Sequence, residues 1–291
     1  MIKGGSVAVM YVERQEMILS CTRMSSKPLL LLPFRILRTT QFACALPAYQ
    51  NKRRHYTFSL KMSKDMDKTG DKIERKVSTH LLASEKHVAE SVKAIKAGKV
   101  IAVPTDTIYG FACDACSAMA VNKIYEIKGR NLTSPLAICV ADVSDISHFA
   151  NVDGLPDGLL DSLLPGPVTV VLTRGDSSIL DESLNPGLKS IGVRVPDYDF
   201  IRAVARGSGS ALALTSANFS GQPCSISPKD FEHLWHHCAY VFDGGLLQSG
   251  RAGSTVVDLT KLRSFKILRS GSAREKTVQV LLSFGLEEEA L

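Results

Sequence analysis

From about residue 81 onward, short apolar runs alternate with helical patterns, and this alternation limits the fold more than any other feature. Several runs are continuously apolar, which is typical of strands buried on both faces of a sheet. Mixed strands and helices around one sheet, an α/β architecture, are therefore expected. The predicted strands are Val100–Val103, Leu136–Val140, Val168–Leu172, Ile191–Val195, Ala211–Leu214, Tyr240–Phe242, Thr255–Leu259 and Phe265–Leu268.

The segments between these runs carry helix signals. Ser84 precedes a pattern in which Val88, Val92 and Ile95 share one face, and Gly98 follows it. Ser117 begins a similar pattern that ends at Gly129. Further helical patterns cover 157–164, 199–206, 228–237 and 273–284. We expect a folded domain over 81–284, followed by an acidic tail over 285–291.

The N-terminal segment differs in composition from the rest of the chain. Residues 1–76 hold 15 of the 35 Lys and Arg but only 6 of the 29 Asp and Glu, so they carry +9 and the remainder carries −3. The stretch between Glu16 and Asp65 has no acidic residue, which is typical of a mitochondrial transit peptide. We expect a targeting segment over 1–60, with a disordered basic tail as the alternative, and a charged linker over 61–80. A second start at Met62 would give a cytosolic form, so mitochondrion and cytoplasm are both expected.

Composition argues against two classes of protein. A nucleic-acid-binding domain carries a basic footprint, whereas this domain is weakly acidic, so stable nucleic-acid binding is not expected. The apolar stretch Leu29–Leu32 is far too short to span a bilayer, and no transmembrane segment is expected.

The seven cysteines lack the spacing of a disulfide framework, so we expect reduced thiols in an intracellular compartment.

Small polar residues directly follow several predicted strands. Pro104–Gly110 (PTDTIYG) comes after Val100–Val103, and Thr215–Gly221 (TSANFSG) comes after Ala211–Leu214. Open sheets bind ligands at such strand ends, although each motif alone is also compatible with an ordinary polar turn. Further segments of this kind are Pro165–Thr169, Ser190–Arg194, Gly253–Asp258 and Arg269–Gly271.

Three cationic residues stand out near these motifs. Lys128 and Arg130 follow a predicted helix, where an ammonium and a planar guanidinium suit a polyphosphate or a carboxylate. Cations at a helix C-terminus are also favourable without any ligand, which is the alternative for this pair. Arg194 lies inside an apolar run and must reach a partner or the edge of the domain.

Standard catalytic motifs are missing from the sequence. It has no Walker-type loop, no nucleophile elbow and no HExxH motif. Cys113 and Cys116 form a single CxxC pair without a second pair at zinc-finger spacing, so a metal site is not expected. His233, His236, His237 and Cys238 cluster on a predicted helix, where a solvated surface is the simpler interpretation.

The motifs taken in order resemble one known family. PTDTIYG, KGR with a following PL, PGPVT, VRVP, TSANFSG, GSTVVDL and ILRSG succeed one another over about residues 85–272, as in the YrdC-like threonylcarbamoyl-adenylate synthases. Each motif is weak alone, but the ordered set is specific. The resemblance implies a YrdC/RibB-like twisted mixed β-sheet flanked by helices, α/β or α+β by scheme, with a concave active site.

The resemblance also implies an activity and its residues. Members condense L-threonine, bicarbonate and ATP, with Mg²⁺, into threonylcarbamoyl-AMP and pyrophosphate, and a separate transferase complex then modifies transfer RNA. It implies a catalytic set of Lys128, Arg130, Ser216 and Asn218. It places Thr105, Arg194 and Ser254 at threonine, and Lys128, Arg130, Ser190, Ser216, Asn218 and Arg269 at ATP.

Two other functions are compatible with the same motifs. A YrdC-like module that binds RNA without synthesis would need a contiguous basic face, and the net charge of the domain argues against one. Carbamoyl transfer from carbamoyl phosphate, as in multidomain maturation factors with a YrdC-like part, would need further domains. The synthase is therefore the leading prediction.

Overall fold

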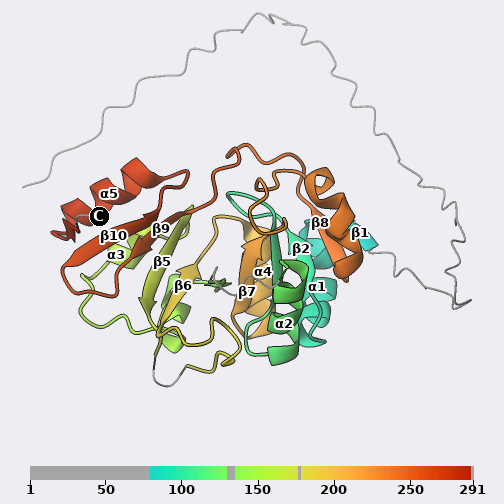
Figure 1. The fold of residues 1–291 in the computed structure, drawn as a ribbon, viewed down its shortest axis with the longest axis horizontal. Coiled ribbons are helices and arrows are strands. Elements are labelled where there is room, and N and C mark those ends of the chain that lie inside the picture. The colour runs from blue at the N-terminus through green and yellow to red at the C-terminus, as the bar shows by residue number, and fades with distance from the viewer. Residues whose placement is uncertain (1–78, 130–134, 176–177, 290–291) are drawn as a thin grey trace, which may run out of the picture. The chain divides into compact units, whose positions relative to one another are not determined.

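The computed structural model describes residues 79–129, 135–175 and 178–289, which belong to one compact unit (Figure 1). The predicted targeting segment, most of the predicted linker and Arg130 lie outside the described residues. None of the helices in the described ranges is long and apolar enough to cross a bilayer.

Every predicted strand is present, with ends that shift by one or two residues. Three strands were not predicted, namely β1, β3 and β11. β3 consists of small residues around one Phe, which is a weak strand signal. The strands are β1 (Thr79–Leu82), β2 (Ile101–Val103), β3 (Gly110–Asp114), β4 (Ala137–Cys139), β5 (Val168–Thr173), β6 (Ser190–Arg194), β7 (Leu212–Ser216), β8 (Tyr240–Asp243), β9 (Thr255–Asp258), β10 (Ser264–Arg269) and β11 (Glu287–Glu288).

The predicted helices are also present. The Ser117 hydroxyl caps α2 by accepting from the Ala120 amide, as predicted, whereas Ser84 makes no such bond and a 3-10 turn comes first. The α-helices are α1 (Val88–Lys96), α2 (Ala118–Ile127), α3 (Leu159–Leu163), α4 (Asp199–Ser208) and α5 (Arg274–Ser283). The 3-10 helices are η1 (Glu85–His87), η2 (Val143–His148) and η3 (Pro228–His237).

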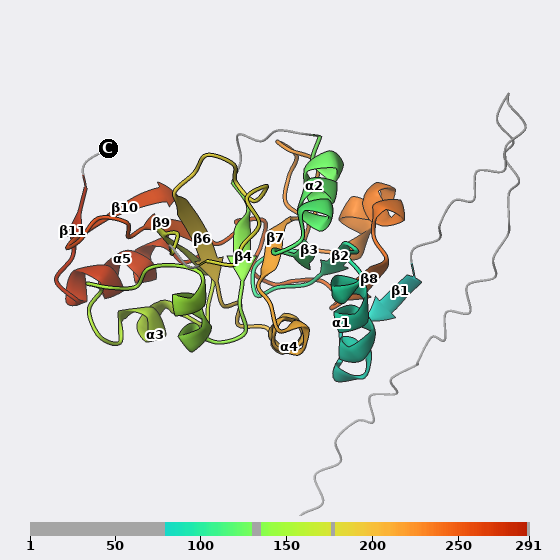
Figure 2. The same cartoon turned by 90° about the horizontal axis from the view of Figure 1, so that it is seen from below.

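One mixed sheet of 11 strands organises the unit, in the order β1-β8-β2-β3-β7-β4-β6-β5-β9-β10-β11. Parallel and antiparallel pairs are interspersed: β4 and β6 run parallel, whereas β5 and β6 run antiparallel. Figure 2 shows α1, α4, α3 and α5 on one side of the sheet and α2 on the other. The strand order places segments that are far apart in the sequence, such as β3 and β7, next to each other.

Two apolar clusters hold these layers together. One packs α1 and α4 against β2, β7 and β8, with Phe200 and Phe242 in contact at a ring-centroid distance of 4.9 Å. The larger one surrounds α2, η2, α3 and α5, and includes Phe111, Phe231 and Phe265, which are almost completely buried. Burying these side chains supplies the main favourable free energy of folding.

The sheet extends beyond both predicted limits of the domain. β1 begins at Thr79 and pairs with β8, ahead of the expected start at residue 81. β11 pairs with β10 inside the segment that the charge pattern predicts as a tail. The burial of Leu286 and an ion pair between Glu289 and Lys261 at 2.8 Å hold β11 against the sheet. The acidic end of the described chain is thus an edge strand.

Candidate active site

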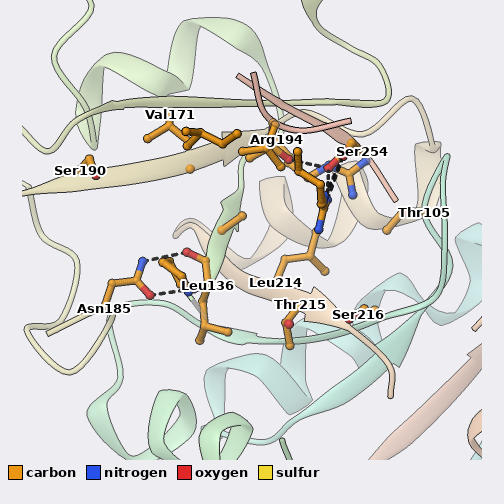
Figure 3. Close-up of a pocket in the computed structure, with 18 of the residues that line it drawn as sticks. Thr105, Leu136, Val171, Asn185, Ser190, Arg194, Leu214, Thr215, Ser216 and Ser254 are labelled. Atoms are coloured by element: carbon orange, nitrogen blue, oxygen red, sulfur yellow. Dashed lines mark hydrogen bonds between the residues drawn. The ribbon is translucent and has the colours of Figure 1, made fainter. Parts of the chain in front are cut away.

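A cleft of about 560 Å³ lies on the concave face of the sheet. In Figure 3, Ser190, Val171, Arg194 and Ser254 lie along one side, and Leu136, Leu214, Thr215 and Ser216 along the other. Six of the predicted site residues line it: Thr105, Ser190, Arg194, Ser216, Ser254 and Arg269. Distant motifs thus meet in one cleft.

Strand alternation explains why β6 can serve both the cleft and the core. Ser190, Gly192 and Arg194 line the cleft, whereas Ile191 and Val193 are buried on the opposite face. A Cβ on Gly192 would approach the Thr169 Cγ2 to 3.0 Å, so a side chain at position 192 would crowd the cleft surface that these two residues form. The predicted strand Ile191–Val195 is therefore an alternating strand, with Gly192 and Arg194 on its cleft face.

Lys128 joins the end of α2 to the polar segment after β7. Its Nζ donates to the carbonyl and hydroxyl of Ser216 at 2.9 and 3.2 Å, and to the carbonyl and Oδ1 of Asn218 at 2.8 and 2.7 Å. The Ser216 hydroxyl in turn donates to Asn218 Oδ1 at 2.6 Å. Burial lowers the pKa of Lys128 to about 8. Lys128 and Asn218 thus support the cleft wall through Ser216.

Arg194 forms an almost completely buried ion pair with Asp106 of the PTDTIYG motif. The Arg194 Nη2 to Asp106 Oδ1 distance is 2.6 Å, and the two side chains are 7% and 8% exposed. The Arg194 Nε is also buried but has no hydrogen-bond partner among the described residues. A buried donor without a partner is costly, and the Arg194 side chain lines the cleft, so its guanidinium is a candidate ligand contact.

Arg269 and Ser254 form a second polar group at the cleft. Arg269 Nη2 donates to the carbonyl and hydroxyl of Ser254 at 2.9 and 3.1 Å, and the hydroxyls of Ser254 and Thr169 are 2.7 Å apart. A β-bulge after Ile267 places both Leu268 and Arg269 opposite Val256, so both line the cleft. Burial lowers the pKa of Arg269, which nevertheless stays charged.

The Thr105 hydroxyl is not free, because it makes hydrogen bonds within its own loop. It is buried, donates to the Ile108 carbonyl at 2.7 Å and accepts from the amides of Thr107 and Ile108 at 3.2 Å each. The hydroxyl therefore orders the loop between β2 and β3. The motif is a structured turn as well as part of the cleft lining.

Sequence reasoning missed three polar residues in the cleft, Asn185, Thr169 and Thr215. Asn185 has a φ of 56° and clamps Leu136 by accepting from its amide at 2.7 Å and donating to its carbonyl at 2.8 Å (Figure 3). The Asn-Pro-Gly sequence at 185–187 is a turn signal that could have indicated it. Thr169 lies in the noted PGPVT segment, but its pairing with Ser254 depends on the β5–β9 contact.

The remaining candidates lie apart from this cleft. Cys113 is buried and Cys116 half-buried, and both are free thiols. The rings of His236 and His237 in η3 have a centroid distance of 3.9 Å and are tilted by 41°. Within the described part of the chain, no three His, Cys, Asp or Glu side chains are grouped to hold a metal ion.

Comparison with known proteins gives concordant results. The Sua5–YciO–YrdC family profile, described as "Telomere recombination", matches residues 93–271. Threonylcarbamoyl-AMP synthase of Bos taurus is 44% identical over 201 residues, which are 67% of this chain and 72% of that protein.

Solved structures agree with this result. Sua5 of Pyrococcus abyssi complexed with L-threonine superposes with a TM-score of 0.62 at 27% identity, and the match covers 73% of this chain and 62% of that one. The chain therefore spans less than two thirds of that structure. Escherichia coli YciO superposes with a TM-score of 0.59 at 25% identity, covering 67% of this chain and 94% of that one.

Proposed function

The chain belongs to the Sua5–YciO–YrdC family, and from this membership and its cleft we propose that it is a threonylcarbamoyl-AMP synthase acting in transfer RNA modification. It condenses L-threonine, bicarbonate and ATP into threonylcarbamoyl-AMP and pyrophosphate. The observation that carries the proposal is the convergence of Arg194, Arg269 and the Lys128 network around one cleft of about 560 Å³. Such a cleft accommodates an amino acid beside a nucleotide.

The threonine subsite lies around Arg194 and Ser254. The Arg194 guanidinium, whose side chain lines the cleft, supplies a charge-assisted hydrogen bond to the substrate carboxylate. Thr105 and Ser254 line the same region and complete the polar contacts. The threonine complex of Pyrococcus abyssi Sua5 supports this part of the proposal.

The nucleotide subsite lies around Ser216 and Arg269. Lys128 and Arg269 offer positive charge to the phosphates, and Ser190 and Ser216 offer hydroxyl groups. Asn218 is proposed to act through the Ser216 hydroxyl, which donates to its Oδ1. Arg130 follows Lys128 by two positions and is proposed to add a planar donor pair to the phosphates, although it lies outside the described residues.

The proposed chemistry requires no nucleophile from the protein. The threonine amine combines with carbon dioxide from bicarbonate to form a carbamate and releases a proton. A carbamate oxygen then attacks the α-phosphorus, the bond to the β-phosphate oxygen breaks, and pyrophosphate leaves. Alignment of bound reactants contributes roughly 7–11 kcal/mol to such a step. Cations directed at the phosphates stabilise the charge that develops there.

Mg²⁺ enters this proposal as part of the MgATP substrate. The described residues present no cluster of carboxylates for a protein-held ion. Mg²⁺ commonly keeps several waters and binds through substrate phosphates, which fits a cleft lined by hydroxyls and cations. Its contribution there would be to neutralise phosphate charge.

We also propose what happens before and after catalysis. The product passes to a separate transferase complex that modifies the adenosine of transfer RNA. The basic N-terminal segment, which has no acidic residue between Glu16 and Asp65, directs one form to mitochondria, and a start at Met62 gives a cytoplasmic form. N-terminal sequencing of the protein purified from each compartment tests this, and identical termini in both would contradict it.

Pyrophosphate release by the full chain tests the proposed activity. Release with MgATP should require both L-threonine and bicarbonate, and serine should replace threonine poorly. A folded sample without threonine-dependent release would refute the synthase. Transfer RNA binding by such a sample would then favour the RNA-binding module.

A further inference from the structure

Asp106 occupies a position that the proposed reaction does not yet use. It lies between β2 and β3, and both of its carboxylate oxygens have partners on a different segment. Oδ1 accepts from Arg194 Nη2 at 2.6 Å, and Oδ2 accepts from the backbone amide of Asp197 at 3.2 Å. Asp106 therefore connects the β2–β3 loop to the end of β6 and the turn before α4.

This arrangement restricts the Arg194 guanidinium. One edge of the planar group is held by Asp106, while Nε is buried without a partner in the described residues and the side chain lines the cleft. An arginine side chain has several rotatable bonds, and a buried guanidinium that lost its carboxylate would shift towards other acceptors or water. The ion pair thus fixes the orientation of the Arg194 guanidinium beside the cleft.

We propose that Asp106 is a positioning residue that sets the threonine affinity by orienting Arg194. The proposal rests on the proposed function, because it assigns the Arg194 guanidinium to the threonine carboxylate. Asp106 does not line the cleft, so its influence passes through Arg194. Because its charge balances that of Arg194, the pair would recognise a carboxylate by directed donors and not by net positive charge.

The test is a double-mutant cycle on the full chain with Asp106→Asn, Arg194→Met and the double variant. Asp106→Asn should raise the threonine KM roughly 10- to 100-fold, as expected for a misplaced contact, and leave the ATP KM within about twofold. In the Arg194→Met background, Asp106→Asn should add no further change in threonine KM. Equal, additive effects in both backgrounds would overturn the proposal, as would an unchanged threonine KM in folded Asp106→Asn.

Asp114→Asn is the matched control for a merely structural role. Asp114 ends β3 and accepts from the Cys116 amide at 2.9 Å and the Ser210 hydroxyl at 3.1 Å, outside the cleft lining. This variant should lower the melting temperature without a selective change in threonine KM. A similar selective change would show that any loss of a loop carboxylate has this effect, and would overturn the proposal.

Calorimetric titration with L-threonine alone separates this inference from the proposed function. If the wild-type chain binds threonine but releases no pyrophosphate, the synthase reaction fails, and the dissociation constants of the same variants still decide the role of Asp106. If the wild-type chain does not bind threonine, both the subsite and the positioning role are refuted.

Discussion

Replacing Lys128 by Met tests the network that supports the nucleotide side of the cleft. The substitution removes an ammonium with four oxygen acceptors within 3.2 Å and retains a side chain of similar length. The Ser216 hydroxyl keeps its bond to Asn218 Oδ1, and water can reach the vacated oxygens of a half-buried site. The expected loss of stability is therefore about 1–3 kcal/mol, which a domain with about 5–15 kcal/mol of stability tolerates.

The effect on catalysis should be larger than the effect on stability. Loss of one preorganised charge at a reacting phosphate typically costs about 2.7–4 kcal/mol, or roughly 100- to 1,000-fold in kcat. Threonine-dependent pyrophosphate release measures this loss, and circular dichroism confirms that the variant is folded. Lys123→Met is the matched control, because Lys123 lies on the same helix in an exposed pair with Glu126 and should be neutral. A folded Lys128→Met protein with activity within threefold of wild type would refute the reasoning.

The pH profile gives a second measurement of the same group. Because burial lowers the pKa of Lys128 to about 8, the free protein loses the ammonium as the pH rises through that value, and kcat/KM for ATP should fall above it. The unfolded chain keeps this proton to about pH 10.5, so deprotonation of Lys128 favours the folded state between these values. The activity loss is therefore not unfolding. Lys128→Arg, which stays charged, should lack this alkaline limb.

Three further changes follow from the geometry of the cleft. Gly271→Ala would place a Cβ 2.2 Å from the Thr255 amide nitrogen, so it should cost about 1–3 kcal/mol and lower the melting temperature by several degrees; an unchanged melting temperature would contradict the close approach. Asn185→Ala removes both hydrogen bonds to Leu136 and should destabilise the protein by about 1–3 kcal/mol in urea denaturation, whereas a neutral variant would show that water replaces them. Arg269→Met should raise the ATP KM more than the threonine KM in pyrophosphate-release assays, and the reverse order would move this residue to the amino-acid subsite.

The fold could be predicted where the sequence signal is local. Largely apolar runs located β2, β5 and β9, and the Ser117 cap located α2, because burial and capping act on neighbouring residues. β1 was missed because its partner β8 lies far along the chain, and β3 because its small residues give a weak strand signal. β11 has charged residues that look like a tail until the adjacent Leu286 is seen to be buried.

The site could be predicted only in part for a similar reason. Polar segments at strand ends indicated Ser216 and Ser254, and Arg194 stood out as a cation inside an apolar run; all three line the cleft. The sequence did not show that Lys128 would be enclosed by oxygen acceptors, which arises from the packing of α2 beside the end of β7. The partner of Arg194 was also hidden, because Asp106 is 88 positions away in sequence.

The bulge in β10 has a consequence for how this cleft can vary between relatives. Leu268 and Arg269 share one place opposite Val256, so the strand carries one more cleft-lining side chain than a regular strand would. Loss of the residue at position 268 would remove an apolar wall and still leave an arginine opposite Val256. Insertions and deletions at this point can therefore resize the cleft while the sheet register and the cation are kept. A one-residue difference in length at this point between two relatives would therefore indicate a difference in cleft size, even where the aligned residues are identical.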